Sequence, residues 1–443
     1  MNFKELKERI RAGNTTTHLV HTFLIYGLIA LSIIVTKVLI ARFYGQEELG
    51  LFSYFFSLVT IVFLFTSLGF PEAVTQTIVK EPEKLRRAVY YAFIFIVPST
   101  MIIILPLVLT NFFMMPELKV HFVVYIVAYT LFYFTYSILR GFKKFAEGSW
   151  YSLANRIIFI AIVIWLGLRQ VNFISVLFGL SVALVLATII SLPRLILFWR
   201  DNWKNNSEDK LGDWSKKEFI SLAFSLFLMQ AGFYLLRETD TLIIPYLTGF
   251  TQLGLYSAHS SISNIIRLIA YVFPVVVLPM AAISRYKMKE SFYKIIKLLV
   301  PFSLLILIAT YVFVPLLYGE QYTDYILPIF LVISSALLVI YSYFNSVFVG
   351  ENKSSRFYFK ILTIDFLLSL IVNTGLIIIL VRSLGILGAP LATTIVVIIK
   401  ILLNIYGIKR LRTQSGEKSD TIALKKEKDI NTGSLLTVDN PDS

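Results

Sequence analysis

The chain lacks cysteine altogether and carries few charged side chains for its length. The absence of cysteine from all 443 residues excludes disulfides, thiolate metal sites, iron–sulfur clusters and a cysteine nucleophile. Charged residues make up 15% of the sequence and hydrophobic residues 57%, whereas a soluble domain is roughly 25% charged. A chain this apolar cannot bury all its hydrophobic surface against itself in water, so we expect it to lie in a lipid membrane.

Motifs for nucleotide, metal or nucleic-acid binding are also missing. The sequence has no Walker A loop and no glycine-rich nucleotide-binding motif, so ATP hydrolysis by this chain is not expected. Its four histidines do not have the spacing of a metal site. The formal net charge is +14, but the basic residues form short clusters between apolar runs, which favours orientation in a membrane over nucleic-acid binding. We therefore expect no metal, no cofactor and no nucleic-acid partner.

What the sequence has instead is a series of long apolar runs. A helix that crosses the roughly 30 Å hydrocarbon core needs about 20 mostly apolar residues. Twelve runs have about this length, at 18–43, 50–79, 88–114, 118–139, 150–168, 172–199, 218–247, 253–283, 291–317, 322–349, 357–381 and 386–408. They lack the two-residue alternation of barrel strands, so they predict helices. The expected fold is an all-α integral membrane protein with twelve transmembrane helices.

The Lys and Arg residues indicate how these helices are oriented, because cytoplasmic loops of membrane proteins carry an excess of both. With a cytoplasmic N-terminus, 32 of the 41 Lys and Arg residues lie in predicted cytoplasmic segments, and the opposite loops hold only Lys119, Arg169 and Arg382. We therefore predict a multi-pass protein of the cytoplasmic membrane with both termini in the cytoplasm.

The polar connections divide the chain into five segments. The longest predicted cytoplasmic connection separates two sets of six spans, and the C-terminal residues are rich in Lys, Asp, Ser and Asn, which is typical of disorder. The predicted organisation is a cytoplasmic segment at 1–17, a six-helix bundle at 18–199, a linker at 200–217, a second six-helix bundle at 218–410 and a disordered cytoplasmic tail at 411–443.

Short motifs recur between the two predicted bundles. GQEELGLFS at 45–53 is matched by GFTQLGLYS at 249–257, and SILRG at 137–141 by SVFVG at 346–350. Both pairs fall at equivalent points of a six-span half, so the halves are repeats with the same orientation, and such repeats place a substrate path at their interface. We expect Gly45 and Gly249 to end the preceding helix in the left-handed conformation.

The segment ARFYGQEELGLFSYFFSLVTIVFLFTSLGFPEAV, its repeat DTLIIPYLTGFTQLGLYSA and the later SLGILGAPLATTI at 383–395 resemble one family of transporters. They are similar to the polysaccharide transporter branch of the multidrug/oligosaccharidyl-lipid/polysaccharide exporter superfamily. This resemblance implies two six-helix bundles that form a V around a central cavity. The implied activity is transfer of a lipid-linked oligosaccharide, usually polyprenyl-diphosphate-linked, from the cytoplasmic to the outer leaflet.

Ionisable residues inside the predicted spans are candidates for the substrate path, since a charge within the bilayer is costly. Arg267 is the strongest, because it lies deep in the eighth span and shares a helix face with Ser260, Asn264 and Tyr271. Arg267, Asn264 and Tyr271 are therefore predicted to bind substrate. A buried structural pair between Arg267 and a carboxylate of another helix is the alternative.

A second group of charges lies in the outer half of the membrane. Arg237 and Asp240 are three residues apart and are expected to pair, with Glu238 between them. The repeat offset brings Lys37 towards Asp240, and Arg42 joins this group. An excess of positive charge would attract a diphosphate or an acidic sugar, so Lys37, Arg42 and Arg237 are predicted to bind substrate. Glu238 and Asp240 are predicted to serve coupling or gating, and a purely structural pair is the alternative.

Two further charges occupy matched positions in the repeats. Arg156 and Asp365 are predicted to form a gating salt bridge between the halves, or else Arg156 extends to the inner headgroups. Lys400 is expected to extend to the inner surface.

Three function classes fit the sequence to different degrees. The leading one is a flippase for a lipid-linked oligosaccharide, with membrane lipid, a glycan polymerase and glycosyltransferases as partners and H⁺ or Na⁺ as the undecided coupling ion. A cation-coupled multidrug exporter is the second, although such proteins usually use carboxylates where this chain has mainly cations. A membrane-embedded polysaccharide polymerase is the third, but the predicted outer loops are too short to hold sugars. The chain is therefore not expected to be an enzyme.

Overall fold

The computed structural model describes residues 14–81, 84–109, 118–142, 145–205, 216–271, 273, 277, 288–350 and 356–433. These residues form helices joined by short turns, and no strand occurs within the ranges just given. The predicted all-α class is therefore confirmed.

The N-terminal half consists of seven described helices, two of which share one predicted span. They are α2 (Asn14–Phe43), α3 (Gln46–Ser67), α4 (Phe70–Lys80), α5 (Leu85–Leu109), α6 (Leu118–Gly141), α7 (Phe145–Leu168) and α8 (Phe173–Asn205). The chain breaks between α3 and α4 because Leu68 and Gly69 both have positive φ angles of 47° and 74°, and Pro71 follows in the first turn of α4. The predicted run 50–79 is thus a broken helix.

The C-terminal half contains more irregular helices. Its elements are α9 (Lys216–Thr248), α10 (Phe250–Ser263), η2 (Asn264–Tyr271), α12 (Met288–Tyr318), η3 (Glu320–Tyr322), α13 (Leu327–Gly350), α14 (Arg356–Leu367), η4 (Leu368–Val372), α15 (Asn373–Leu384), η5 (Gly385–Leu387) and α16 (Gly388–Gly433). The eighth predicted span changes from α-helix to a 3₁₀-helix at Asn264, and the eleventh contains a π-helical turn at η4. Such irregular turns inside a helix are frequent at functional sites.

Helix length and composition identify the protein as a multi-pass membrane protein. Among the described residues, nine helical stretches are long and apolar enough to cross a membrane, and one of them, 357–413, covers two predicted runs. The predicted runs 18–43 and 253–283 correspond to α2 and to α10 with η2. Each of the twelve predicted runs therefore overlaps helical structure among the described residues.

The outer surface of the helices has the character of a lipid-facing surface. On α5, Met101, Ile102 and Leu109 are 66%, 70% and 74% exposed. On α12, Leu298 and Ile308 are 65% and 61% exposed. Rows of exposed apolar side chains of this kind are stable only in contact with lipid.

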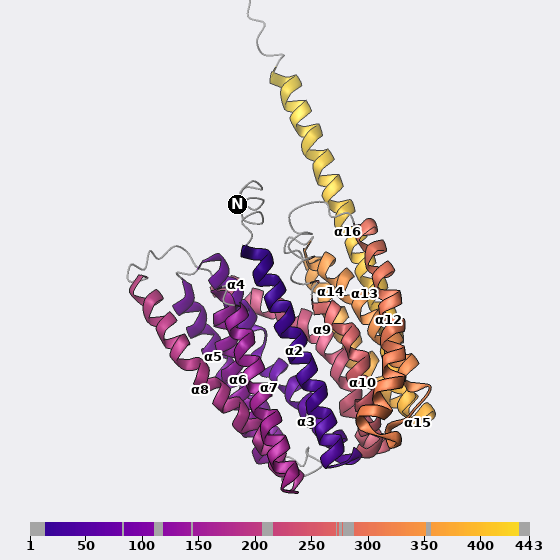
Figure 1. Cartoon of the computed structure of the whole chain (residues 1–443). Helices are drawn as coiled ribbons and strands as arrows, with labels where there is room; N and C mark the ends of the chain where they lie inside the picture. The colour runs from indigo at the N-terminus through magenta and orange to yellow at the C-terminus, as the bar shows by residue number, and fades with distance from the viewer. Residues whose placement is uncertain are drawn as a thin grey trace, which may run out of the picture.

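The helices form two groups that meet along α3, α9 and α10. In Figure 1, α4–α8 lie on one side and α10 and α12–α16 on the other, while α2 and α3 run between them. We call the end of the molecule with the α2–α3 and α9–α10 turns the hairpin end, and the opposite end the linker end. One apolar core joins the halves at the hairpin end, where Leu49 and Phe52 of α3 share a cluster with Leu253 and Tyr256 of α10.

The last helix extends into the predicted C-terminal tail, whereas most of the predicted linker lies outside the described residues. The sequence predicts disorder from residue 411, but α16 continues as a helix to Gly433. Ala, Leu, Glu and Lys, which are frequent at 417–428, favour helix formation. Residues 434–443, most of the predicted N-terminal segment and residues 206–215 of the predicted linker lie outside the described residues.

Candidate functional site

The two copies of the repeated motif lie against each other at the hairpin end. Gly45 precedes α3 with φ 108° and ψ −172°, and Gly249 precedes α10 with φ 88° and ψ 166°. Both φ angles are positive, as expected, but ψ is extended, so the prediction of the left-handed helical conformation is wrong. This backbone region is essentially restricted to glycine, which explains why both motifs begin with it.

A pair of glycines one turn further on lets α3 and α10 cross in backbone contact. A Cβ added to Gly50 would lie 2.0 Å from the carbonyl oxygen of Phe250, and one added to Gly254 would lie 1.9 Å from that of Gln46. Gly50 is equivalent to Gly254 in the repeat, and Gln46 to Phe250. The contact is therefore symmetric, and we call these four residues the glycine crossing. The repeated motif is thus one of the surfaces by which the halves touch.

Polar side chains continue this contact one turn deeper. Ser53 and Ser257, again equivalent in the repeat, are hydrogen-bonded with 2.5 Å between their hydroxyl oxygens. Lys37 of α2 donates from Nζ to the Ser257 hydroxyl at 2.9 Å. The repeat alignment predicts that Lys37 lies beside Asp240. In the structure the hydrogen bond of Lys37 goes to Ser257 instead, and Asp240 is bound by the preceding residue, Tyr256. Lys37 therefore links the N-terminal half to α10.

The acidic residues of α9 are held by side chains of both halves. Glu238 accepts hydrogen bonds from Arg237 Nε at 2.5 Å and from the Ser57 hydroxyl of α3 at 2.6 Å. Asp240 accepts a hydrogen bond from the Tyr256 hydroxyl of α10. The sequence predicts a pair between Arg237 and Asp240, but Arg237 forms its ion pair with its neighbour Glu238. Glu238 thus joins α3 to α9 in the middle of the interface.

Arg42 lies apart from this group, at the hairpin end of α2. Its Nε and Nη2 donate to the carbonyl oxygens of Leu317 and Leu316 at 2.7 Å and 2.8 Å. These carbonyls belong to the last turn of α12 and have no partner within that helix. The structure therefore gives Arg42 a helix-capping contact between the halves.

Arg267 is buried inside the C-terminal half. Its side chain is 4% exposed, and Nε donates to the Ser335 hydroxyl of α13 at 3.0 Å. It also lies close enough to Asp240 for their charges to interact, so substrate binding and the structural pair both stay predictions for Arg267. Because η2 is a 3₁₀-helix, residues three apart align, so Asn264 shares the face of Arg267 but the predicted α-helical stripe does not continue. The side chain of Tyr271 lies outside the described part of the structure.

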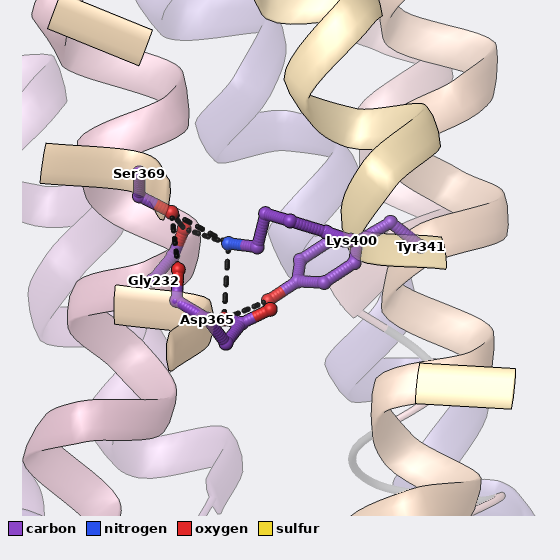
Figure 2. Close-up of polar contacts among 5 residues, drawn as sticks. All are labelled: Gly232, Tyr341, Asp365, Ser369 and Lys400. Atoms are coloured by element: carbon purple, nitrogen blue, oxygen red, sulfur yellow. Dashed lines mark hydrogen bonds and ion pairs between the residues drawn. The ribbon is translucent and has the colours of Figure 1, made fainter. Parts of the chain in front are cut away.

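Asp365 and Lys400 form a buried ion pair within the C-terminal half (Figure 2). Lys400 Nζ lies 3.0 Å from Asp365 Oδ2 and donates to the Gly232 carbonyl at 2.8 Å and the Ser369 hydroxyl at 2.6 Å. The Tyr341 hydroxyl donates to the same carboxylate oxygen at 2.8 Å. Ser369 lies in the π-helical turn η4. We call these residues the Lys400 cluster.

Two expectations fail at the Lys400 cluster. The predicted gate between Arg156 and Asp365 is wrong, because Asp365 pairs with Lys400 of its own half. Lys400 does not extend to the membrane surface either, since its side chain is 0% exposed. A buried carboxylate is a stronger attraction for an ammonium group than the distant headgroups, provided that hydrogen bonds complete the site.

Arg156 points into the protein from the middle of α7. Its guanidinium lies 5.2 Å from the ring centre of Phe56 on α3, and it is near Tyr125 and Tyr129 of α6. Nε is buried without a hydrogen-bond partner, and no salt bridge to Arg156 is found within the described residues. The guanidinium of Arg156 thus lies against Phe56, and the described residues provide no carboxylate within salt-bridge distance of it.

An aromatic row beside Arg156 was missed in the sequence. The rings of Tyr125, Tyr129 and Tyr133 are stacked along α6, with centroids 5.9 Å and 6.1 Å apart. Phe63 of α3 contacts the last two rings edge-on, at 4.8 Å and 4.9 Å. The signal is the four-residue spacing of tyrosines in YIVAYTLFY, which places them on one helix face.

One ring of the row lies near charged groups of the C-terminal half. Tyr129 is within range of the charges of Arg237 and Glu238 of α9 as well as of Arg156. Arg237 itself lies over the ring of Tyr234, 4.8 Å from its centre. The interface thus combines cations, aromatic rings and hydroxyl groups. Such a surface can bind a ligand that has an anionic part next to a polar part. No group of three or more His, Asp or Glu side chains suited to a metal occurs in the part of the chain that the structure describes.

Comparisons with known proteins agree with this architecture. A family model described as "Polysaccharide biosynthesis protein" matches residues 16–286. No curated protein sequence matches significantly.

Solved transporters share the fold at low sequence identity. The lipid II flippase MurJ, in an inward closed conformation, is 18% identical with a TM-score of 0.61, covering 89% of this chain and 87% of that one. An inward-facing multidrug resistance MATE family transporter of the MOP superfamily is 13% identical with a TM-score of 0.57, covering 87% and 96%. The Vibrio cholerae MATE transporter VcmN, in its bent form, is 16% identical with a TM-score of 0.57, covering 90% and 99%.

Proposed function

The chain belongs to the polysaccharide biosynthesis protein family, and from that premise we propose that it is a flippase for a lipid-linked oligosaccharide. The cargo is a polyprenyl-diphosphate-linked glycan, which moves unchanged across the cytoplasmic membrane by alternating access, for assembly of a cell-surface polysaccharide. The hairpin end faces outwards and both termini lie in the cytoplasm, because the basic clusters flank the linker end. A glycan polymerase and glycosyltransferases are the proposed protein partners.

The observation that carries this proposal is the guanidinium of Arg156, which has no salt-bridge partner among the described residues. Removing a guanidinium from water costs several kcal/mol unless an anion or hydrogen-bond acceptors replace its hydration. The described residues provide Arg156 with the face of Phe56 but with no carboxylate within salt-bridge distance. A diphosphate would supply both the missing charge and acceptors for a bidentate contact. The glycan would enter between the halves while the polyprenyl tail stays in lipid.

The alternative is a cation-coupled multidrug exporter, which the buried carboxylates Glu238 and Asp240 favour. However, Glu238 is already bound by Arg237 and Ser57, and Asp240 by Tyr256. A cationic drug would have to displace the partners of Glu238, whereas Oδ1 of Asp240 has no hydrogen-bond partner within the described residues. The cations Lys37, Arg156 and Arg237 near the same interface favour an anionic cargo instead.

Transport of a defined lipid in proteoliposomes tests the proposal. The protein is expected to move fluorescent undecaprenyl-diphosphate-linked disaccharide between leaflets, measured as the fraction that dithionite can quench over time. Arg156→Gln is expected to lower the initial rate at least about tenfold, because one charge-assisted contact is worth about 1.5–3 kcal/mol. Runs with an imposed H⁺ or Na⁺ gradient identify the coupling ion.

Arg169→Gln is the matched control, since Arg169 follows the same helix and lies over the ring of Trp165 at 5.1 Å. It is expected to transport at the wild-type rate. If the wild-type protein transported no lipid but did export ethidium, the flippase proposal would be wrong. The drug-exporter alternative would then be favoured.

A reversible lock tests alternating access separately. The hydroxyl oxygens of Ser53 and Ser257 lie 2.5 Å apart, and the chain has no cysteine of its own. Oxidation of the double variant Ser53→Cys/Ser257→Cys is expected to form a disulfide and to stop transport, and dithiothreitol is expected to restore it. The single cysteine variants serve as controls. Undiminished transport by the cross-linked protein would contradict opening of the halves at the hairpin end.

A further inference from the structure

The tyrosine row of α6 has the properties of a binding surface rather than of core packing alone. Tyr129 and Tyr133 are half-buried, whereas Tyr125 of the same row is 1% exposed and the core tyrosine Tyr341 is 0% exposed. The Tyr129 hydroxyl forms no hydrogen bond within the part of the chain that the structure describes. A phenol in an apolar surrounding normally finds a partner, so this hydroxyl is available to a ligand.

The spacing along the row suits a ligand with repeated units. Four residues of α-helix advance about 6 Å, in agreement with the 5.9 Å and 6.1 Å between successive ring centres. The rings are nearly parallel, with interplanar angles of 20° and 28°. Phe63 holds Tyr129 and Tyr133 in this orientation from α3. The row is therefore held in place, and its half-buried members Tyr129 and Tyr133 present ring edges with their centres 6.1 Å apart.

Charged groups define the two ends of this surface. Near Tyr129 lie the cations Arg156 and Arg237. At the other end the Tyr133 hydroxyl donates to Glu72 Oε1 at 2.7 Å, which leaves the second carboxylate oxygen of Glu72 as an acceptor. Positive charge at one end suits phosphate, and a carboxylate beside aromatic rings suits sugar hydroxyls.

We propose that Tyr129, Tyr133 and Glu72 form a glycan-binding track, on which pyranose units lie while Arg156 holds the adjoining diphosphate. This inference rests on the proposed function and adds which surface recognises the sugar. The ring edges, which carry partial positive charge, contact the oxygen atoms of a pyranose. Its hydroxyls bind the Tyr129 hydroxyl and the Glu72 carboxylate. In this proposal, Tyr129 and Tyr133 of α6 and Glu72 of α4 recognise the glycan. The cations bind the phosphates and do not contribute to specificity for the sugar.

Binding of two probes to detergent-solubilised protein separates sugar from phosphate recognition. The probes are undecaprenyl diphosphate and undecaprenyl-diphosphate-linked disaccharide, and the measurement is the dissociation constant by microscale thermophoresis. The wild-type protein is expected to bind the disaccharide probe more tightly. Tyr129→Leu and Tyr133→Leu are each expected to weaken binding of the disaccharide probe about fivefold, as loss of an aromatic contact would, with binding of undecaprenyl diphosphate unchanged. Arg156→Gln is expected to weaken both.

Retained binding of undecaprenyl diphosphate shows that each tyrosine variant is folded. Tyr293→Leu, at a 77% exposed position on α12, is the matched control and should bind both probes like the wild type. Tyr129→Phe keeps the ring and is expected to lose less affinity for the disaccharide probe than Tyr129→Leu.

The outcomes distinguish this track from the proposed function. A wild-type protein that binds neither probe argues against the flippase itself. Equal binding of both probes by the wild type, or unchanged sugar affinity in both leucine variants, overturns the track and leaves the flippase standing. If Tyr129→Leu and Tyr129→Phe both lost affinity for the two probes to the same extent, the tyrosine row would have a structural role. That result would also overturn the glycan-binding track.

Discussion

Gly50→Ala is expected to reduce transport at least about tenfold although it adds only one methyl group. The new Cβ would lie 2.0 Å from the carbonyl oxygen of Phe250, and a backbone oxygen cannot move aside as a flexible side chain can. Overpacking of this kind costs about 1–3 kcal/mol, and about 1.4 kcal/mol changes a population tenfold. The cost falls only on the state with the hairpin end closed, so the population shifts towards the open state.

Cross-linking measures this shift directly. The hydroxyl oxygens of Ser53 and Ser257 lie 2.5 Å apart across the closed hairpin end. In the variant Ser53→Cys/Ser257→Cys, disulfide formation is expected to be fast, and Gly50→Ala is expected to slow it. Since the chain has no cysteine, no background thiol interferes.

Gly27→Ala is the matched control, because a Cβ at Gly27 meets nothing within 4 Å. It should leave transport and cross-linking unchanged. Gly254→Ala should reproduce Gly50→Ala, since the two glycines are equivalent in the glycine crossing. Full transport by Gly50→Ala, with cross-linking as fast as in the Gly27→Ala background, would disprove the role of the crossing in closing the hairpin end.

Lys400→Met is expected to cause the largest loss of stability. It leaves the carboxylate of Asp365, which is 1% exposed, without its ammonium partner. Breaking a buried pair on one side costs about 3–5 kcal/mol, so the thermal midpoint of the purified protein, measured by scanning fluorimetry, should fall by several degrees.

The double variant Lys400→Met/Asp365→Asn tests the cause of that loss. Removing the charge from both positions is expected to recover most of the thermal midpoint, because the unpaired carboxylate rather than the lost contact dominates the cost. Lys297→Met, at an exposed position on α12, is the control and should not change the midpoint. A double variant no more stable than Lys400→Met alone would show that the cluster stabilises the fold through packing instead.

The polar contacts between the halves differ in kind from the ion pair inside the C-terminal half. We expect the contacts between the halves to open during transport and the ion pair to stay closed. Contacts between the halves at the hairpin end involve hydroxyl pairs such as Ser53 with Ser257 and one lysine, Lys37. Hydrogen bonds of this type are worth about 0.5–1.5 kcal/mol each and can be exchanged for water or ligand. The Lys400 cluster is fully buried within one half, where it can keep α9 and α16 together while that half moves as a unit.

The sequence by itself determined the helices, their number and the repeat. Apolar runs of about 20 residues predict spans without knowledge of neighbours, because lipid requires every backbone group to be bonded within its own helix. The break after α3 is likewise local, since Gly69 and Pro71 act on the backbone where they stand. The glycines of the repeated motif marked the place where the halves meet, although their packing role was visible only in the structure.

Only the tertiary structure decided which polar groups meet. Residue spacing predicted Arg237 with Asp240 and Arg156 with Asp365, but Arg237 pairs with Glu238 and Asp365 with Lys400. Such partners depend on the rotation of each helix about its axis and on irregular turns such as η2 and η4, which shift that rotation. In lipid the apolar faces of a helix differ little in energy, so contacts with other helices set its rotation. The spans are therefore a property of each segment, whereas the charged interface is a property of the assembled bundle.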